Sequence, residues 1–196
     1  MIESQILLSV NTYLSNRGYK VVRLNPKNLQ SNIKCPDFEV FFKEKRNFYC
    51  EVKSPLLLIN EVTKMFHWTT SVTKLRDLIH KAVSQFSDQD PQHKFPWVLV
   101  FTSDHMQLNW SNMTHAIAGK IYYGEKLITD LNHLRRVKET VKDVDQIDLF
   151  VWMQMSEDAE IYQIRIMIQP KTKLMNQVIE IGKRFEPLPA DKSFKR

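Results

Sequence analysis

Two short runs of sequence, Pro36-Asp37 and Glu51-Val52-Lys53, hold the residue types that metal-dependent hydrolysis of a phosphodiester requires. Carboxylate oxygens are the protein ligands that Mg²⁺ prefers, and a bound Mg²⁺ lowers the pKa of an attacking water. A lysine beside such a centre supplies a compact positive charge and helps to orient and deprotonate that water. This chemistry requires Asp37, Glu51 and Lys53 to lie on one surface.

The segments that carry these residues alternate as β-strands do. Apolar residues occupy every second position on both sides of the charged break at 44–46, namely Phe38, Val40, Phe42, Phe48, Cys50 and Val52. A hairpin with a three-residue loop, in which Lys43 faces Asn47, buries all six on one face. The opposite face then holds Asp37, Glu39, Glu51 and Lys53.

This register predicts that Asp37 lies opposite Lys53 and that Glu39 lies opposite Glu51. Asp37 and Glu51 are then diagonal neighbours, about 7 to 8 Å apart along the backbone, a gap that two side chains can close around one cation. Acids gathered on one face repel each other, and a divalent cation relieves that repulsion. The Val52 side chain faces the core, so its carbonyl is available as a further metal ligand, while Glu39 is a supporting acid or an outward surface charge.

The two motifs together resemble the signature of the PD-(D/E)xK nuclease superfamily. The resemblance implies an α/β fold with a restriction-endonuclease-like or Holliday-junction-resolvase-like core: a helix, a three-stranded antiparallel meander, a helix and a further strand. Additional C-terminal helices and strands would follow this core. It also implies that Asp37 and Glu51 bind the metal and that Lys53 is the catalytic lysine.

Two further site residues follow from the same resemblance. Many members place a metal-binding glutamate on the first helix, and Glu3 fits that place on the stripe of Leu7, where we expect it to point toward the core side. Members similar to the RecB nuclease domain carry a glutamine on the helix after the motif lysine, and Gln85 is similarly placed, although no tyrosine follows four residues later. A helix dipole alone also favours an acid such as Glu3 in a first turn.

Lys74 and Lys81 share a helical stripe with Gln85 and would present positive charge to a phosphate backbone. The alternative for Lys81 and Gln85 is the solvated polar side of an amphipathic helix. The segment 54–71, between the motif lysine and this helix, is expected to be a lid or a substrate-contacting insertion.

Periodicity predicts the elements that position these residues. Helical patterns are expected for about four turns up to Gly18, over 71–87, near 111–120 and, strongly charged, over 126–142. Strands are expected over 19–24, 97–101, 147–153 and 161–168, and the continuous apolar run at 97–101 predicts a strand covered on both faces. We expect one domain over 1–185 and a basic tail over 186–196.

The bulk composition narrows the class of protein. Lys and Arg outnumber Asp and Glu by 28 to 22, and the resulting net charge of +6 suits a polyanionic partner. The two cysteines form no CxxC pair, and the histidines lack metal-ligand spacing, so neither a disulfide framework nor a structural zinc site is indicated. We expect an intracellular, cytoplasmic protein, in the nucleoid or nucleus if it acts on DNA, without a membrane span.

The sequence therefore predicts a Mg²⁺-dependent nuclease, with Mn²⁺ able to substitute, that acts on DNA as an endonuclease rather than an exonuclease. RNA is a possible substrate, and a homodimer or a partner protein is possible. A second hypothesis is a non-catalytic nucleic-acid-binding or assembly protein on the same scaffold. A third is an unrelated α/β protein in which Glu51 and Lys53 belong only to a cross-strand network of ion pairs.

Overall fold

The computed structural model describes residues 2–24, 34–55, 68–123, 126–130 and 142–185. The elements of the first half are α1 (Glu3–Ser15), β1 (Lys20–Arg23), β2 (Phe38–Phe42), β3 (Lys45–Lys53), α2 (Trp68–Gln89) and β4 (Trp97–Ser103). The second half contributes α3 (Trp110–Ala118), β5 (Lys120–Tyr123), β6 (Lys126–Asp130), β7 (Leu149–Met155), β8 (Ile161–Ile168) and α5 (Met175–Phe185).

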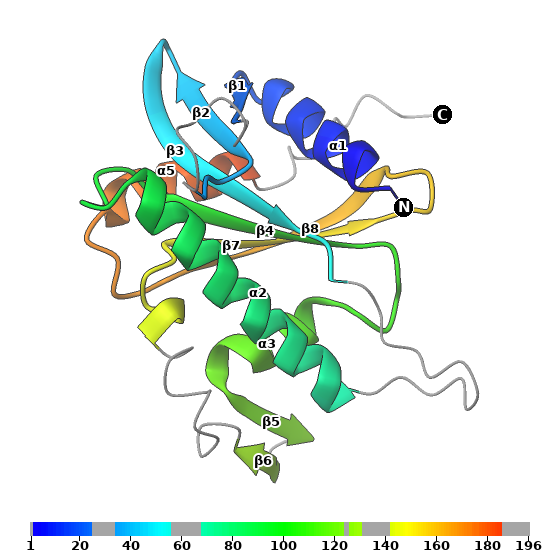
Figure 1. Ribbon diagram of the computed structural model, residues 1–196. Coiled ribbons are helices and arrows are strands. Elements are labelled where there is room, and N and C mark those ends of the chain that lie inside the picture. Colours follow the sequence, from blue (N-terminus) through cyan, green and yellow to red (C-terminus); the bar gives the residue numbers. More distant parts are fainter. Residues whose placement is uncertain (1, 25–33, 56–67, 124–125, 131–141, 186–196) are drawn as a thin grey trace, which may run out of the picture.

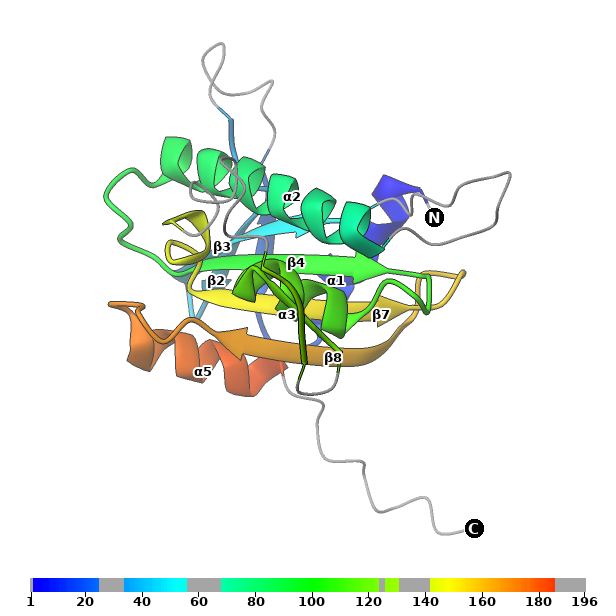
Figure 2. The same ribbon diagram turned by 90° about the horizontal axis from the view of Figure 1, so that it is seen from below.

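A mixed sheet of six strands in the order β1-β2-β3-β4-β7-β8 forms the centre of an α/β fold (Figure 1). Strands β1, β2 and β3 form an antiparallel meander, β4 and β7 continue it in parallel, and β8 closes the far edge antiparallel. Strands β3, β4 and β7 therefore end at the same edge of the sheet (Figure 2). Within the described residues, no helix is long and apolar enough to span a bilayer.

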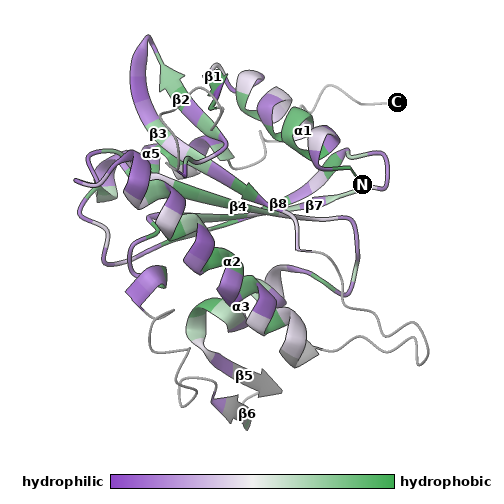
Figure 3. Ribbon diagram, viewed as in Figure 1, coloured by the Kyte–Doolittle hydropathy of each residue, from purple (hydrophilic) through white to green (hydrophobic). Residues whose placement is uncertain are grey.

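Helices cover both faces of this sheet, and each face has its own hydrophobic core. Val10 of α1 and Phe185 of α5 pack on one face, whereas Ile79 of α2 and Met113 of α3 pack on the other. Strand β4 contributes alternate residues to the two cores and is buried along its whole length, as the prediction of a strand covered on both faces requires. Hydrophobic residues accordingly run along the central strands (Figure 3).

The β2–β3 hairpin packs the six predicted apolar side chains into one core, with Phe42 only partly buried, but its predicted register is wrong by two residues. The turn contains only Lys43 and Glu44, both with positive φ (50° and 61°), which fits the twist of a two-residue hairpin. Such a turn alone would place the two strands out of phase. A bulge beyond it leaves Asn47 unpaired and restores Phe48 to its place opposite Val40.

Most predicted elements are confirmed within a few residues, with one clear error. The charged helix predicted over 126–142 is wrong at its start, because Lys126–Asp130 form β6 and pair with β5 in a separate two-stranded sheet. Residues 131–141 lie outside the described residues, as do 56–67 of the predicted insertion and the predicted tail 186–196. The rest of that insertion is partly helical, because α2 already begins at Trp68.

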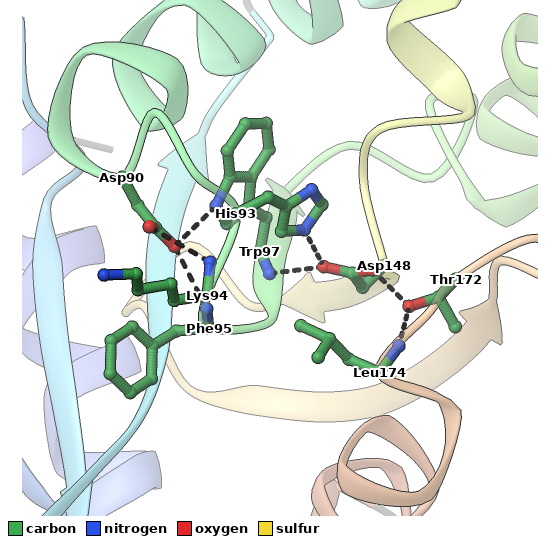
Figure 4. A network of polar contacts seen from close by, with 8 residues as sticks. All are labelled: Asp90, His93, Lys94, Phe95, Trp97, Asp148, Thr172 and Leu174. Carbon is green, nitrogen blue, oxygen red and sulfur yellow. Dashed lines mark hydrogen bonds and ion pairs between the residues drawn. The ribbon is translucent and has the colours of Figure 1, made fainter.

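Two buried aspartates hold the other end of the parallel strands (Figure 4). Asp90, just beyond α2, accepts hydrogen bonds from the backbone N–H of Lys94 at 3.1 Å and of Phe95 at 3.0 Å. Asp148, just before β7, accepts the backbone N–H of Trp97 at 2.8 Å. These contacts fix where β4 starts relative to α2 and β7. The predicted site residues lie at the opposite end of the parallel strands.

Candidate active site

A pocket of about 410 Å³ opens beside the C-terminal end of β3, and six predicted residues line it. They are Glu3 from α1, Asp37 ahead of β2, Glu51, Val52 and Lys53 from β3, and Gln85 from α2. Ile6, Ser54 and Leu78 complete the lining. The fold thus brings together side chains that are up to 82 positions apart in the chain, as Glu3 and Gln85 are.

Asp37 and Glu51 are held against each other by the backbone of both strands. The Asp37 N–H donates to Glu51 Oε2 at 2.9 Å, and the Val52 N–H donates to Asp37 Oδ2 at 2.9 Å. The pairing of Phe38 with Cys50 continues to place Asp37 opposite Glu51, not opposite Lys53 as predicted. The corrected register makes the two carboxylates direct neighbours across the strands, which is closer than the predicted diagonal arrangement.

Burial makes this pair of acids electrostatically unfavourable. Glu51 is only 1% exposed, and this burial, together with the adjacent Asp37 charge, raises its pKa to about 8. Burial likewise raises the pKa of Asp37. The ammonium of Lys53 acts in the opposite direction on both groups, but it does not cancel the effect of burial. The pocket is therefore a place where added positive charge is favoured.

Lys53 is fixed by one contact within its own strand, β3, and one contact to the helix α2. Its Nζ donates to Glu51 Oε1 and, at 2.8 Å, to Gln85 Oε1. The Gln85 amide in turn donates to the Cys35 carbonyl at 2.9 Å, so α2 connects the motif lysine to the segment before Asp37. Sequence reasoning missed Cys35, because any residue can supply a backbone carbonyl and no residue type signals this role.

The remaining predicted residues lie around the pocket rather than at its centre. Glu3 is exposed and does not point toward the core as expected, yet it lines the pocket, and its charge contributes to the raised pKa of Asp37. Lys74 and Lys81 do not line the pocket but share the α2 stripe of Leu78 and Gln85, which do. Glu39 forms an ion pair with Arg46 outside it.

The donor set of the pocket fits a hard divalent cation. Within the described ranges, no three His, Cys, Asp or Glu side chains converge closely enough to ligate one metal by themselves. Mg²⁺ does not need such a cluster, because it binds through one or two carboxylates and keeps several waters. Asp37 and Glu51, with the Val52 carbonyl beside them, match that requirement. A cation would offset the two effects that raise the pKa of Glu51, namely burial and the charge of Asp37.

Comparisons with known proteins add nothing to this geometry: no family model, curated protein or solved structure matches the chain. The resemblance to PD-(D/E)xK nucleases accordingly consists of the two motifs and their surroundings. The site itself, with its distances, burial and charges, carries the functional argument.

Proposed function

We propose that this protein is a Mg²⁺-dependent nuclease of the PD-(D/E)xK type that cuts DNA as an endonuclease. The observation that carries the proposal is the convergence of Asp37, Glu51 and Lys53 in one pocket, with Gln85 hydrogen-bonded to the lysine. The order of α1, the β1–β3 meander, α2 and the parallel β4 supports a restriction-endonuclease-like core.

Asp37, Glu51 and the Val52 carbonyl would hold the cation, which when bound polarises the phosphate and favours ionisation of a water. Lys53 has three N–H donors, of which Glu51 and Gln85 take two. The third can reach a phosphate oxygen or the attacking water at the mouth of the pocket. Gln85 holds the ammonium in this orientation, because its own amide is fixed by the Cys35 carbonyl.

The charge around the pocket supports an extended polyanionic substrate. The chain carries a net charge of +6, and Lys74 and Lys81 flank the pocket along α2. Backbone phosphates are bound by such lysines without sequence specificity, so these contacts would position the strand rather than read it. DNA is the substrate we propose, and RNA is tested beside it.

The alternative is a non-catalytic nucleic-acid-binding or assembly protein on this scaffold. The observation that favours it is the ion pair of Lys53 with Glu51, which together with the backbone N–H of Asp37 gives each Glu51 oxygen a partner without a metal. The same pair would serve as a purely structural network in an unrelated α/β protein. These alternatives predict no metal-dependent cleavage.

Cleavage of plasmid DNA, single-stranded DNA and RNA in Mg²⁺, Mn²⁺ or EDTA tests the proposal. We expect cutting in either metal, none in EDTA, and losses of about 10²- to 10⁴-fold for Asp37→Asn and Lys53→Ala. Asp145→Asn and Lys171→Ala are matched controls, because this exposed ion pair lies outside the pocket. Failure to cut any substrate in either metal, or full activity of Asp37→Asn, contradicts the assignment.

A further inference from the structure

A second groove, of about 410 Å³, collects side chains suited to nucleobases. The exposed members of its lining include Met106 and Tyr162, which are 82% and 64% exposed despite their large apolar surfaces. Trp110, Gln163 and Arg165 line it as well, and its described lining includes no carboxylate. Aromatic rings stack on bases, and amide and guanidinium groups bind base edges, so this combination is typical of a surface that binds unpaired nucleotides.

The walls of the groove are fixed by hydrogen bonds. Gln154 donates to the carbonyls of Ser103 and His105, both at 3.0 Å, which holds the segment between β4 and α3. Asn109 donates to the Met106 carbonyl at 3.1 Å and also caps α3, so the start of the helix that carries Trp110 is held in place. The groove is therefore preorganised for a ligand.

A β-bulge directs Tyr162 away from the ladder of the sheet. Gln154 pairs with Gln163 and Met155 pairs with Ile161, which leaves Tyr162 as the extra residue. Bulges of this kind redirect a side chain next to functional sites. Among the described residues, no hydrogen bond or ion pair engages the side chains of Tyr162, Gln163 or Arg165. These groups are available to a ligand.

The groove shares a sheet face and a sheet edge with the candidate active site. Lys53 pairs with Phe101, Phe101 with Trp152, and Trp152 with Arg165, so one lateral row connects the two places. Three steps between neighbouring strands span about 14 Å. The strands that connect them end at one edge of the sheet (Figure 2). A polynucleotide strand a few residues long can span this distance.

We propose that this groove binds unpaired bases of a single-stranded nucleic acid segment whose phosphodiester backbone continues to the pocket of Asp37, Glu51 and Lys53. The inference rests on the proposed function for the identity of the polymer. Tyr162 stacks on a base, Trp110 and Met106 form the apolar wall, and Gln163 and Arg165 bind the base edge or the adjacent phosphate. The substrate class is single strands, or duplexes with an unpaired segment.

Fluorescence anisotropy in EDTA with three probes tests the groove: an oligothymidylate strand, an abasic strand of equal length and a duplex of equal length. We expect wild type to bind oligothymidylate most tightly and Tyr162→Ala to weaken that binding about tenfold, since stacking on one base is lost. Binding of the abasic strand should not change. Tyr162→Phe keeps the ring and should bind as wild type, as should Leu8→Ala, an exposed residue on α1.

The proposal is overturned if wild type binds none of the probes or prefers the duplex, or if Tyr162→Ala weakens the abasic and thymidylate strands equally. Because these assays contain EDTA, they are independent of catalysis. If the protein gives the expected binding results but never cleaves, the proposal for the groove stands and the proposed function is contradicted. If the protein cleaves duplexes and single strands alike and Tyr162→Ala is fully active, the proposed function stands and the proposal for the groove is contradicted.

Discussion

Two buried acids lie at opposite ends of the parallel strands and have opposite surroundings. Asp148 is 3% exposed and Glu51 is 1% exposed, so each has lost nearly all contact with water. Asp148 accepts hydrogen bonds from the Trp97 N–H and from Thr172, and it contacts His93 at 2.6 Å (Figure 4). Glu51 instead faces a second carboxylate, that of Asp37.

The two acids differ in how their buried charge is balanced by the groups around them. A buried carboxylate that accepts several hydrogen bonds and has no acid opposite it stabilises the chain around it. A buried carboxylate placed against another acid weakens the fold unless it holds a proton or a cation, and such arrangements cluster at functional sites. Burial alone does not distinguish Asp148 from Glu51; the partners of the carboxylate do.

The largest effect on stability is expected for Asp148→Ala. This change leaves the buried Trp97 N–H without its acceptor and removes the partner of Thr172, so the free energy of unfolding should fall by about 2–4 kcal/mol. Urea denaturation measures it, and Asp145→Ala, which removes a half-buried acid paired with the exposed Lys171, should stay within about 0.5 kcal/mol of wild type. Equal losses for the two variants would contradict a structural role for Asp148.

The pH dependence of stability should show that the charge on Glu51, unlike that on Asp148, destabilises the fold. Its pKa is raised from 4.5 to about 8 on folding, so the folded state keeps a proton in this range that the unfolded state releases. Stability of the metal-free protein therefore decreases as pH rises from about 4.5 to about 8, by at most about 1.4 kcal/mol per pH unit. Thermal unfolding of wild type and Glu51→Gln across this range checks it: the slope should be smaller in the variant, and identical slopes would exclude Glu51 as the cause.

A smaller gain in stability is expected for Asp37→Asn. The amide oxygen can still accept the Val52 N–H, while the charge that raises the pKa of Glu51 is removed. At alkaline pH in EDTA, the variant should be more stable than wild type by about 1 kcal/mol, although the proposed function predicts a large loss of activity for it. A destabilised Asp37→Asn protein would place Asp37 in the same class as Asp148.

Gln85→Leu should lower kcat about tenfold with little change in the midpoint of unfolding. The variant removes the acceptor that orients Lys53 but leaves the Glu51 contact in place. A positioning role predicts a change in kcat at nearly constant KM, and Gln85→Glu should restore part of the rate because it supplies an acceptor again. A change confined to KM would assign Gln85 to substrate binding instead.

The smallest effect is expected for Lys81→Gln. Loss of one phosphate contact should weaken binding of all DNA sequences alike and reduce the slope of log K against log salt by about one. Lys171→Gln, whose lysine pairs with Asp145 outside the pocket, should leave the slope unchanged. A slope that does not change for Lys81→Gln would remove this residue from the nucleic-acid interface.

The sequence predicted which residues lie together in one pocket better than it predicted the strand register that brings them there. Alternation of apolar residues was enough to place Phe38 and Phe48 in one core, because parity alone decides the face of a strand. The two-residue shift depends on a tight turn at Lys43-Glu44 and a bulge at Asn47, and the types of these residues do not predict either feature. Gln85 was found only through the family resemblance.

The sequence pattern did not reveal which elements far apart in the chain pack against each other. Helix α5, whose Phe185 packs in the same core as Val10, was not predicted as a separate element. Charged residues downstream of β6 led to the prediction of a helix from residue 126, where Lys126–Asp130 form this strand instead. The groove around Tyr162 depends on a bulge in β8 and on the position of α3, which tertiary packing sets rather than local propensity.

Metal-dependent thermal stability tests the central claim most directly, namely that Asp37 and Glu51 form a cation site and not a structural pair. Wild type and Asp145→Asn should be stabilised by Mg²⁺ and by Mn²⁺, by about 2.7 kcal/mol when the metal is at about 100 times Kd. Asp37→Asn should show no such shift in either metal. A wild type whose midpoint does not move with metal, or an Asp37→Asn variant that moves equally, would contradict the claim.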